Sequence, residues 1–241
     1  PLETPAMENL DTLMGKYGEE GDKLIFKILN NGLDNPAKLE QIKADFDKVL
    51  EGKNTKGITE RALRYDLTIP FARYVAMNFG QLTLPFKRYQ IQPVWRADRP
   101  QKGRYRQFYQ VGIEAIGLND PLIDAEVIWL ADQAFKNIGL KNYRLEITSL
   151  GDAESRAAHR KDLLKFYETL NLDEATASRA KLNPLRLFDD KRPEMVEAMS
   201  KAPKLLDYLN EDSKLHFEKV RAYLDALGVQ YEINSKLVRG F

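Results

Sequence analysis

Polar and apolar side chains alternate along two neighbouring stretches of the chain, Phe86–Trp95 and Gln107–Gly117. Successive side chains of a strand point to opposite faces, so both stretches are predicted to be strands with one polar and one apolar face. The polar face of the second strand carries Phe108, Gln110, Gly112 and Glu114. An aromatic ring, an amide, a gap and a carboxylate are an unusual set for a solvated surface. The gap at the glycine lets a ligand approach the backbone.

The connection between the two strands, Ala97–Tyr105, is longer and more basic than a tight turn requires. It carries Arg99, Lys102 and Arg104 against one acid, Asp98, and the preceding strand adds Arg88, Gln90, Gln92 and Arg96 on its polar face. Guanidinium groups meet phosphate oxygens bidentately. An aromatic ring can stack on a nucleobase with a gain of roughly 0.5–1.5 kcal/mol. These residues indicate an anion or nucleotide site, but a solvent-facing sheet with an exposed basic loop explains the alternation equally well.

The other face of this predicted hairpin is apolar and is expected to belong to a core. It carries Tyr89, Ile91 and Trp95 on the first strand and Tyr109, Val111, Ile113 and Ala115 on the second.

Two further polar sets interrupt the predicted elements. Arg64–Thr68 lies where a strand gives way to a helix, so Asp66 or Thr68 either caps the helix or faces a substrate amino group. Leu237–Gly240 places Arg239 in an apolar strand. A buried arginine needs a partner, which is an anionic ligand or a salt bridge.

The elements that position these sets mix helices and strands, and the chain is predicted to be α+β. Helical spacing marks residues 6–16, 36–50, 67–78, 120–138, 153–170, 173–181 and 213–227, and strand character marks 23–29, 58–64, 143–149, 229–233 and 237–241. Three domains or parts are expected: residues 1–150, a mostly helical insertion over 151–228, and a return to the first part over 229–241.

The composition excludes several classes of function. With 241 residues, 43% of them hydrophobic, the chain can bury a substantial core. The formal net charge of +1 makes any basic surface local. The chain has no cysteine and only two histidines, His159 and His216, so disulfides, thiolate chemistry and histidine-rich metal sites are not expected. No apolar run reaches the roughly 18–20 residues of a membrane span.

Taken together, these sets resemble histidyl-tRNA synthetases, a family of class II aminoacyl-tRNA synthetases. Arg96–Phe108, which reads RADRPQKGRYRQF, is similar to the strand–loop–strand of motif 2. Leu63–Thr68 is similar to the amino-acid-binding segment, and Leu237–Gly240 to the start of the histidine-specific motif. Residues 183–186 and 202–208 resemble the insertion domain of the family. The resemblance implies a class II antiparallel sheet flanked by helices.

The resemblance also implies roles for individual residues in ATP binding. Arg96 would hold the α-phosphate, Arg104 the outer phosphates, and Phe108 would stack on adenine. Asp98 stands where the family contacts the adenine amino group, usually through a glutamate.

For the amino acid, the implied roles fall on residues of three separate segments. Asp66, Thr68 and Gln110 would orient the α-amino group of histidine. Glu114 would accept a hydrogen bond from the imidazole. Arg239 would bridge the substrate carboxylate and the α-phosphate, which makes Arg96 and Arg239 the expected catalytic residues.

The implied reaction is the ATP-dependent formation of histidyl-adenylate and transfer of the histidyl group to tRNA(His). Mg²⁺ would arrive with ATP, and no protein-bound metal is expected. The resemblance further implies a cytoplasmic homodimer whose insertion domain contacts the tRNA acceptor stem. Parts of the family pattern are expected outside Pro1–Phe241, including most of motif 1, motif 3 and an anticodon-binding domain. The chain alone is therefore expected to lack aminoacylation activity.

Two other functions fit parts of the sequence. The synthetase-like regulatory subunit of ATP phosphoribosyltransferase resembles the same core, but it generally lacks the insertion that residues 151–228 resemble. A pure RNA-binding or dimerisation module is disfavoured by the near-neutral charge, and more strongly by the face that carries Phe108, Gln110 and Glu114.

Overall fold

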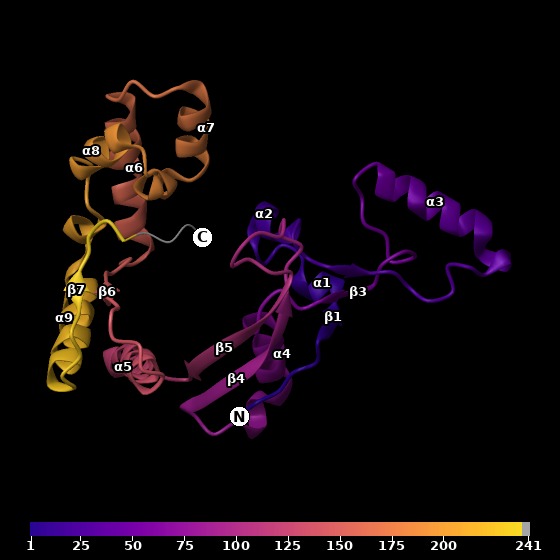
Figure 1. Ribbon diagram of the computed structural model, residues 1–241, viewed down its shortest axis with the longest axis horizontal. Coiled ribbons are helices and arrows are strands. Elements are labelled where there is room, and N and C mark those ends of the chain that lie inside the picture. Colours follow the sequence, from indigo (N-terminus) through magenta and orange to yellow (C-terminus); the bar gives the residue numbers. More distant parts are fainter. Residues whose placement is uncertain (238–241) are drawn as a thin grey trace. The chain divides into compact units, whose positions relative to one another are not determined.

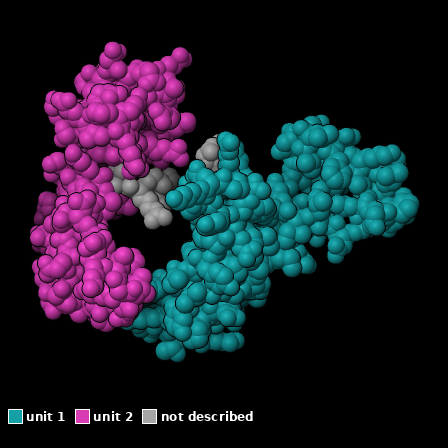
Figure 2. Space-filling model, in the orientation of Figure 1, with its two compact units in different colours: residues 1–118 teal, residues 119–241 magenta. Residues whose placement is uncertain are grey.

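The chain divides into two compact units, Pro1–Leu118 and Asn119–Phe241 (Figure 2). The computed structural model describes residues 1–237, with the side chains of residues 19 and 20 left aside. Each unit has buried apolar clusters of its own. The predicted three-part division at residues 150 and 228 stays a prediction.

Unit 1 contains two antiparallel sheets and several helices (Figure 1). Its elements are β1 (Met7–Asn9), α1 (Leu10–Leu13), α2 (Gly18–Asp22), β2 (Lys27–Ile28), η1 (Pro36–Lys38), α3 (Leu39–Leu50), β3 (Arg61–Leu63), α4 (Thr68–Asn78), η2 (Phe79–Gln81), β4 (Phe86–Trp95) and β5 (Gln107–Ile116). The small sheet has the order β1-β3-β2, and the second sheet in the described part of unit 1 is the hairpin β4-β5.

The predicted hairpin is confirmed, and its register fixes which side chains share a face. Arg88 lies opposite Glu114, Gln90 opposite Gly112, and Gln92 opposite Gln110. These pairs form the polar face, and the alternate pairs, such as Ile91 with Val111, form the apolar face.

The prediction that the apolar face lies in a core was wrong. Tyr89, Ile91, Tyr109 and Val111 are 51%, 53%, 70% and 65% exposed. On the polar face, by contrast, Arg88 and Gln90 are only 5% and 1% exposed. The alternation shows that a strand has two different faces, but burial depends on what packs against each of them. In unit 1 the packing partners lie on the polar side.

One of these partners is the extended segment at the start of the chain. The backbone N–H of Leu2 donates to the Tyr89 carbonyl at 3.1 Å. The backbone N–H of Thr4 donates to Gln92 Oε1 at 3.0 Å, and the Thr4 hydroxyl accepts from Gln90 Nε2 at 2.8 Å. The segment therefore lies along β4 and satisfies the buried amides of its polar face.

A second partner is Arg64, which is 1% exposed. Its Nε donates to the Pro93 carbonyl at 2.9 Å, and its Nη1 donates to the Thr4 carbonyl at 2.6 Å. A buried guanidinium is tolerated when its donors are satisfied, and here they join β3, β4 and the first segment. Arg64 is thus a structural residue.

Helix α4 begins where the sequence predicts, and Pro70 occupies its first turn, where a missing N–H costs nothing. Phe71 packs against Phe86 of β4, with ring centroids 6.3 Å apart. Arg73 forms a two-pronged ion pair with the buried Glu8 of β1, with both N–O distances 2.8 Å. Helix α4 is therefore held against both sheets of unit 1.

The other predicted elements of unit 1 are shorter in the structure or more exposed than expected. Strands β2 and β3 cover only part of residues 23–29 and 58–64. The helix predicted over 6–16 was wrong at its start, where Met7–Asn9 forms β1, and α1 covers only Leu10–Leu13. The apolar stripe of α3 is not covered: Leu39, Phe46 and Val49 are 48%, 40% and 38% exposed. Periodicity predicts the helix, but it does not provide the surface that would cover the stripe.

Unit 2 is mostly helical. Its elements are α5 (Pro121–Asn137), β6 (Glu146–Ile147), α6 (Ala153–Glu168), α7 (Glu174–Leu182), η3 (Pro184–Asp189), α8 (Pro193–Ser200), η4 (Leu205–Tyr208), α9 (Glu211–Ala226) and β7 (Glu232–Ile233). Strands β6 and β7 pair in parallel, and Ala125 of α5 shares a buried cluster with Val220 and Leu224 of α9. The predicted strand over 237–241 lies outside the described residues, apart from Leu237.

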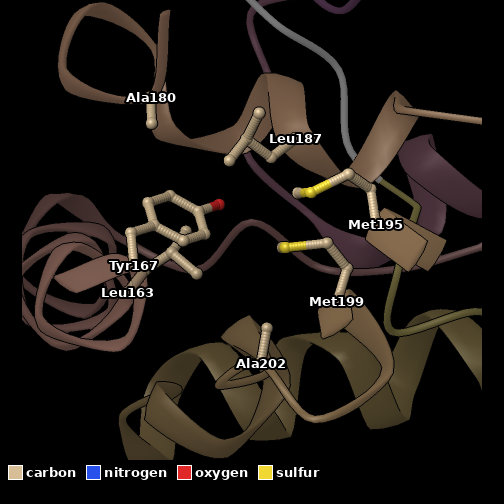
Figure 3. Packing of buried hydrophobic residues seen from close by; sticks show 7 residues of the cluster. All are labelled: Leu163, Tyr167, Ala180, Leu187, Met195, Met199 and Ala202. Carbon is tan, nitrogen blue, oxygen red and sulfur yellow. The ribbon is translucent and has the colours of Figure 1, made fainter. Parts of the chain in front are cut away.

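A second cluster of unit 2 joins α6, α7, η3 and α8 (Figure 3). It contains Leu163, Tyr167, Ala180, Leu187, Met195, Met199 and Ala202. The Tyr167 hydroxyl donates to the Pro184 carbonyl at 2.6 Å, so the polar end of the ring is satisfied. Asp152, Asp173 and Asn210 cap α6, α7 and α9, since each side chain accepts a backbone N–H of the first turn.

Candidate active site

Two aromatic rings flank the Arg96 guanidinium at the end of β4. Its central carbon lies 4.3 Å from the centroid of the Tyr65 ring and 5.1 Å from that of Phe108. Arg96 Nε donates to the Tyr65 carbonyl at 3.2 Å. Nε is the only side-chain nitrogen of Arg96 that donates a hydrogen bond to another described residue, so the two terminal nitrogens are left for an anion. The prediction that Arg96 and Phe108 act together is consistent with this stacking.

The basic connection folds back on itself in a tight turn over Gln101–Arg104. Gly103 has a φ of +77°, a backbone conformation that glycine adopts without the steric cost of a side chain. Arg104 Nη1 lies 3.4 Å from Asp98 Oδ1, and the Arg104 side chain is 58% exposed. Arg99 and Lys102 are exposed as well. The turn thus presents exposed cationic side chains in the connection that follows Arg96.

Asp66 has the capping role that the sequence left open. Its Oδ1 accepts the backbone N–H of Thr68 at 3.0 Å and that of Ile69 at 3.2 Å, in the first turn of α4. Oδ1 also accepts the Tyr17 hydroxyl at 3.1 Å. Every hydrogen bond to Asp66 among the described residues goes to Oδ1, which leaves Oδ2 for another donor. Capping and ligand binding are therefore compatible, and the Thr68 side chain is exposed.

Tyr17 was not singled out by the sequence, because a tyrosine outside any motif carries no signal. Its ring packs on Tyr65, with centroids 4.5 Å apart and planes inclined by 39°. Burial and the adjacent Asp66 carboxylate raise the pKa of the Tyr17 hydroxyl, which therefore stays a donor at neutral pH. Tyr17, Tyr65 and Arg96 form a continuous stack beside Asp66.

One buried acceptor atom on the polar face of β5 has neither a hydrogen-bond donor nor an ion-pair partner within the described part of the chain. It is Gln110 Oε1. Buried polar atoms are nearly always satisfied, so this acceptor is a candidate for binding an N–H donor of a ligand.

Glu114 is held by Arg88. Arg88 Nε and Glu114 Oε2 form an ion pair, with the two atoms 2.9 Å apart. Burial raises the pKa of the Glu114 carboxyl, Arg88 lowers it, and the nearby Asp66 raises it.

Of the predicted residues of unit 1, Arg96 and Phe108 are in contact, and Asp98 and Arg104 pair in the connection that follows. Gln110 and Glu114 lie on the polar face of β5, and Asp66 and Thr68 lie at the start of α4. Arg88 connects these two segments, because it pairs with Glu114 and donates to the Leu67 carbonyl. Arg239 lies outside the described residues, so its predicted role has no structural description.

The described residues offer no cluster of three or more His, Cys, Asp or Glu side chains that could hold a metal ion. Within the same residues, no helix is both long and apolar enough to cross a membrane.

The arrangement combines an arginine between two aromatic rings with a buried amide oxygen, Gln110 Oε1, that has no donor among the described residues. The fold that carries it is found in solved class II synthetases. The apo histidyl-tRNA synthetase of Staphylococcus aureus matches with a TM-score of 0.65 and 29% identity, covering 99% of this chain and 49% of that one. A histidyl-tRNA synthetase from Nostoc sp. PCC 7120 matches with a TM-score of 0.58 at 22% identity, covering 100% of this chain and 54% of that one, and supports the fold alone.

The family model described as histidyl-tRNA synthetase matches residues 39–241. A histidine–tRNA ligase of Corynebacterium kroppenstedtii is 41% identical over 240 residues, covering 100% of this chain and 51% of that protein. One from Corynebacterium jeikeium is 55% identical over 163 residues, covering 68% of this chain and 37% of that protein. The chain belongs to the histidyl-tRNA synthetase family. It spans about half, or less, of the length of these curated relatives.

Proposed function

We propose that the protein to which this chain contributes activates histidine with ATP and transfers the histidyl group to tRNA(His). The observation that carries this proposal is the buried acceptor Gln110 Oε1, which has no donor among the described residues, on the strand that also carries Phe108 and the Glu114 carboxylate. Histidine offers the matching donors, an α-ammonium group and an imidazole N–H. Family membership supports the same substrate.

On the nucleotide side, Arg96 binds the α-phosphate through its terminal nitrogens, and Phe108 stacks on adenine. The contact between the Arg96 guanidinium and the Phe108 ring, 5.1 Å to the centroid, preorganises both. Arg104 reaches the outer phosphates, which replace Asp98 as its ion-pair partner. Losing the pair with Asp98 costs little free energy, because an exposed ion pair contributes at most ~1 kcal/mol. Asp98 is then released to contact the adenine amino group.

On the amino-acid side, Glu114 accepts the imidazole N–H, and Gln110, Asp66 and Thr68 orient the α-ammonium group. Asp66 contributes Oδ2, since Oδ1 caps α4. A site built to hydrogen-bond a ring N–H rejects analogues without it by ~10⁴-fold or more. Glu114 is therefore the proposed source of specificity.

The proposed reaction begins with an in-line attack of the histidine carboxylate oxygen on the ATP α-phosphorus. A new P–O bond forms, the bond from the α-phosphorus to the bridging oxygen breaks, and pyrophosphate leaves. Charge grows on the α-phosphate oxygens, where Arg96, together with Arg239, stabilises it. Positioning and electrostatics suffice, because no nucleophile of the protein is required. The ribose hydroxyl at the tRNA 3′ end then attacks the carbonyl carbon and releases AMP.

Further parts of the proposal rest on family membership. Mg²⁺ accompanies ATP as part of the substrate complex, tRNA(His) is the acceptor, and the whole protein is a cytoplasmic homodimer. The mostly helical residues 151–228 are the proposed insertion domain, between a core over 1–150 and its continuation over 229–241.

The test is the binding of a non-hydrolysable histidyl-adenylate analogue to the full-length protein by calorimetry. Arg96→Ala and Glu114→Ala are expected to weaken binding by roughly 10- to 100-fold each, since a hydrogen bond to a charged group contributes ~1.5–3 kcal/mol. The controls are Arg61→Ala and Glu60→Ala, which remove the same side chains from exposed positions in and beside β3.

Unchanged affinity in both site variants would refute the assignment of the site. Binding of the analogue without histidine-dependent exchange of pyrophosphate into ATP would instead favour the regulatory-subunit alternative.

A further inference from the structure

Arg88 is a buried arginine of β4 that has no role in the proposed function. It lies directly opposite Glu114 in the register of β4 and β5. The Arg88 side chain is 2% exposed and that of Glu114 is 22% exposed, and Nε and Oε2 are 2.9 Å apart. The guanidinium therefore lies behind the carboxylate, on the side away from solvent.

The remaining nitrogens of Arg88 reach two other segments of unit 1. Nη2 donates to the Leu67 carbonyl at 3.3 Å, and Nη1 donates to Gln90 Oε1. The flat group lies over the Phe71 ring, 4.1 Å from its centroid. Leu67 stands between Asp66 and Thr68, so one guanidinium joins the carboxylate on β5 to the segment that begins α4.

The backbone beside Arg88 is shaped for the same arrangement. A side-chain carbon added at Gly112 would lie 3.4 Å from Glu114 Oε1 and 3.8 Å from Arg88 Nη1. Gly112 therefore lies directly beside the Arg88–Glu114 pair, at ordinary van der Waals distance. Arg88, Gly112 and Glu114 lie on one face of two paired strands.

Stability alone does not explain a charged group at this position. Taking a guanidinium and a carboxylate out of water costs about as much as their attraction returns, and apolar replacements of similar volume are often neutral or stabilising. Arg88 lies over the Phe71 ring, against which a methionine could pack. The geometry instead matches a role in the site.

We propose that Arg88 is a positioning residue for histidine: it fixes the direction of the Glu114 carboxylate and couples it to the Asp66–Thr68 segment. This proposal rests on the proposed function. Arg88 does not touch the substrate, since Glu114 stands between them. Its Nε pairs with Oε2 of Glu114, so the other oxygen, Oε1, is left to accept the imidazole N–H.

The charge of Arg88 also sets the protonation of Glu114. Burial and Asp66 raise the pKa of the Glu114 carboxyl, and Arg88 opposes both. Only the ionised carboxylate is a pure acceptor. Without Arg88 the pKa of the Glu114 carboxyl rises further. The acidic limb of the histidine-binding profile, where protonation of Glu114 weakens binding, then moves to higher pH.

The experiment compares Arg88→Met and Arg88→Lys with the wild-type full-length protein. Dissociation constants for histidine and for ATP are measured separately, across pH 5–8. Arg88→Met is expected to weaken histidine binding ~10-fold or more, to leave ATP affinity within about twofold, and to shift the acidic limb upward. Arg88→Lys keeps the charge but lacks the fork that reaches Glu114 and Leu67 together. It is expected to weaken histidine binding without shifting the limb. Arg61→Met, at an exposed arginine of β3, is the matched control.

The outcomes separate this proposal from the proposed function. If the wild type binds neither histidine nor ATP, the proposed function fails. If the wild type binds both and the Arg88 variants keep its histidine affinity, the Arg88 proposal alone is wrong. Equal losses of histidine and ATP affinity would show a merely structural role. If Arg88→Met does not fold, Arg88→Lys decides the question in the same way, by its loss of histidine affinity compared with its loss of ATP affinity.

Discussion

Tyr17 and Tyr65 contact the two charged side chains of the candidate site, Asp66 and Arg96. The Tyr17 hydroxyl donates to Asp66 Oδ1, and the Tyr17 ring packs on Tyr65, which in turn lies against Arg96. One residue therefore supports both halves of the site by two different interactions. The hydroxyl acts on the amino-acid side, and the ring acts on the nucleotide side.

This division predicts different effects for two substitutions of Tyr17. Tyr17→Phe keeps the ring and removes the hydroxyl, so histidine binding should weaken by about threefold to tenfold, the usual range for one lost hydrogen bond, with ATP affinity unchanged. Tyr17→Leu also removes the support of Tyr65 and should weaken ATP binding as well. Calorimetry with each ligand checks both expectations, and equal effects of the two variants would contradict the division.

At the residue scale the sequence predicted the composition of the site but not its supports. Phe108, Gln110 and Glu114 share a face because strand alternation requires it, and the register confirms that they do. The roles of these residues in binding remain predictions. Tyr17 gave no signal, because its importance comes from contacts with Asp66 and Tyr65, far away in sequence. Arg88 was seen as part of the polar face, but its pairing with Glu114 needed the register.

At the scale of elements, local signals placed most helices and the hairpin, whereas the direction of burial was not predictable. Pro70 and the caps at Asp152, Asp173 and Asn210 are local features, and the helices begin where they indicate. The burial of the polar face of β4 depends on the N-terminal segment and on Arg64, which contact it from distant parts of the sequence. No periodicity within β4 contains that information.

The helical cluster around α6 offers a quantitative test at this scale. Leu163 is 0% exposed and packs in this cluster, so Leu163→Ala should lower the free energy of unfolding by ~2–5 kcal/mol through the cavity it leaves. Leu182→Ala removes the same atoms from a side chain that is 84% exposed, and should change the free energy by less than ~0.5 kcal/mol. Urea unfolding followed by far-UV circular dichroism measures both. Similar losses in the two variants would contradict the description of the cluster.

At the scale of the whole molecule, each unit has its own core, but the hairpin is covered on one side only. The exposed apolar face of β4 and β5 includes Tyr89, Ile91, Tyr109 and Val111. An exposed apolar surface on a two-stranded sheet promotes association between chains. The chain of residues 1–241, studied alone, is therefore expected to self-associate.

The double variant Ile91→Thr and Val111→Thr should reduce this association. Threonine keeps the β-branched shape that strands favour and removes apolar surface from a cross-strand pair. Sedimentation velocity should show a shift toward monomer, with an unchanged midpoint of thermal unfolding. Leu50→Thr is the control, since Leu50 is 85% exposed but lies on α3, outside the hairpin. If Leu50→Thr reduces association by the same amount, association depends on general surface hydrophobicity and not on the hairpin.

The contacts of the N-terminal segment have a consequence for the order of folding. Thr4 meets Gln92 and Gln90 across sequence separations of 88 and 86 residues, and Arg64 across 60. During synthesis these partners emerge long after Thr4 itself, so the first residues of the chain are among the last of unit 1 to reach their native contacts. The contact between Tyr167 and Pro184 in unit 2 spans only 17 residues and closes without such a delay. Until β4 has been made, the segment around Thr4 has no native partner on that strand.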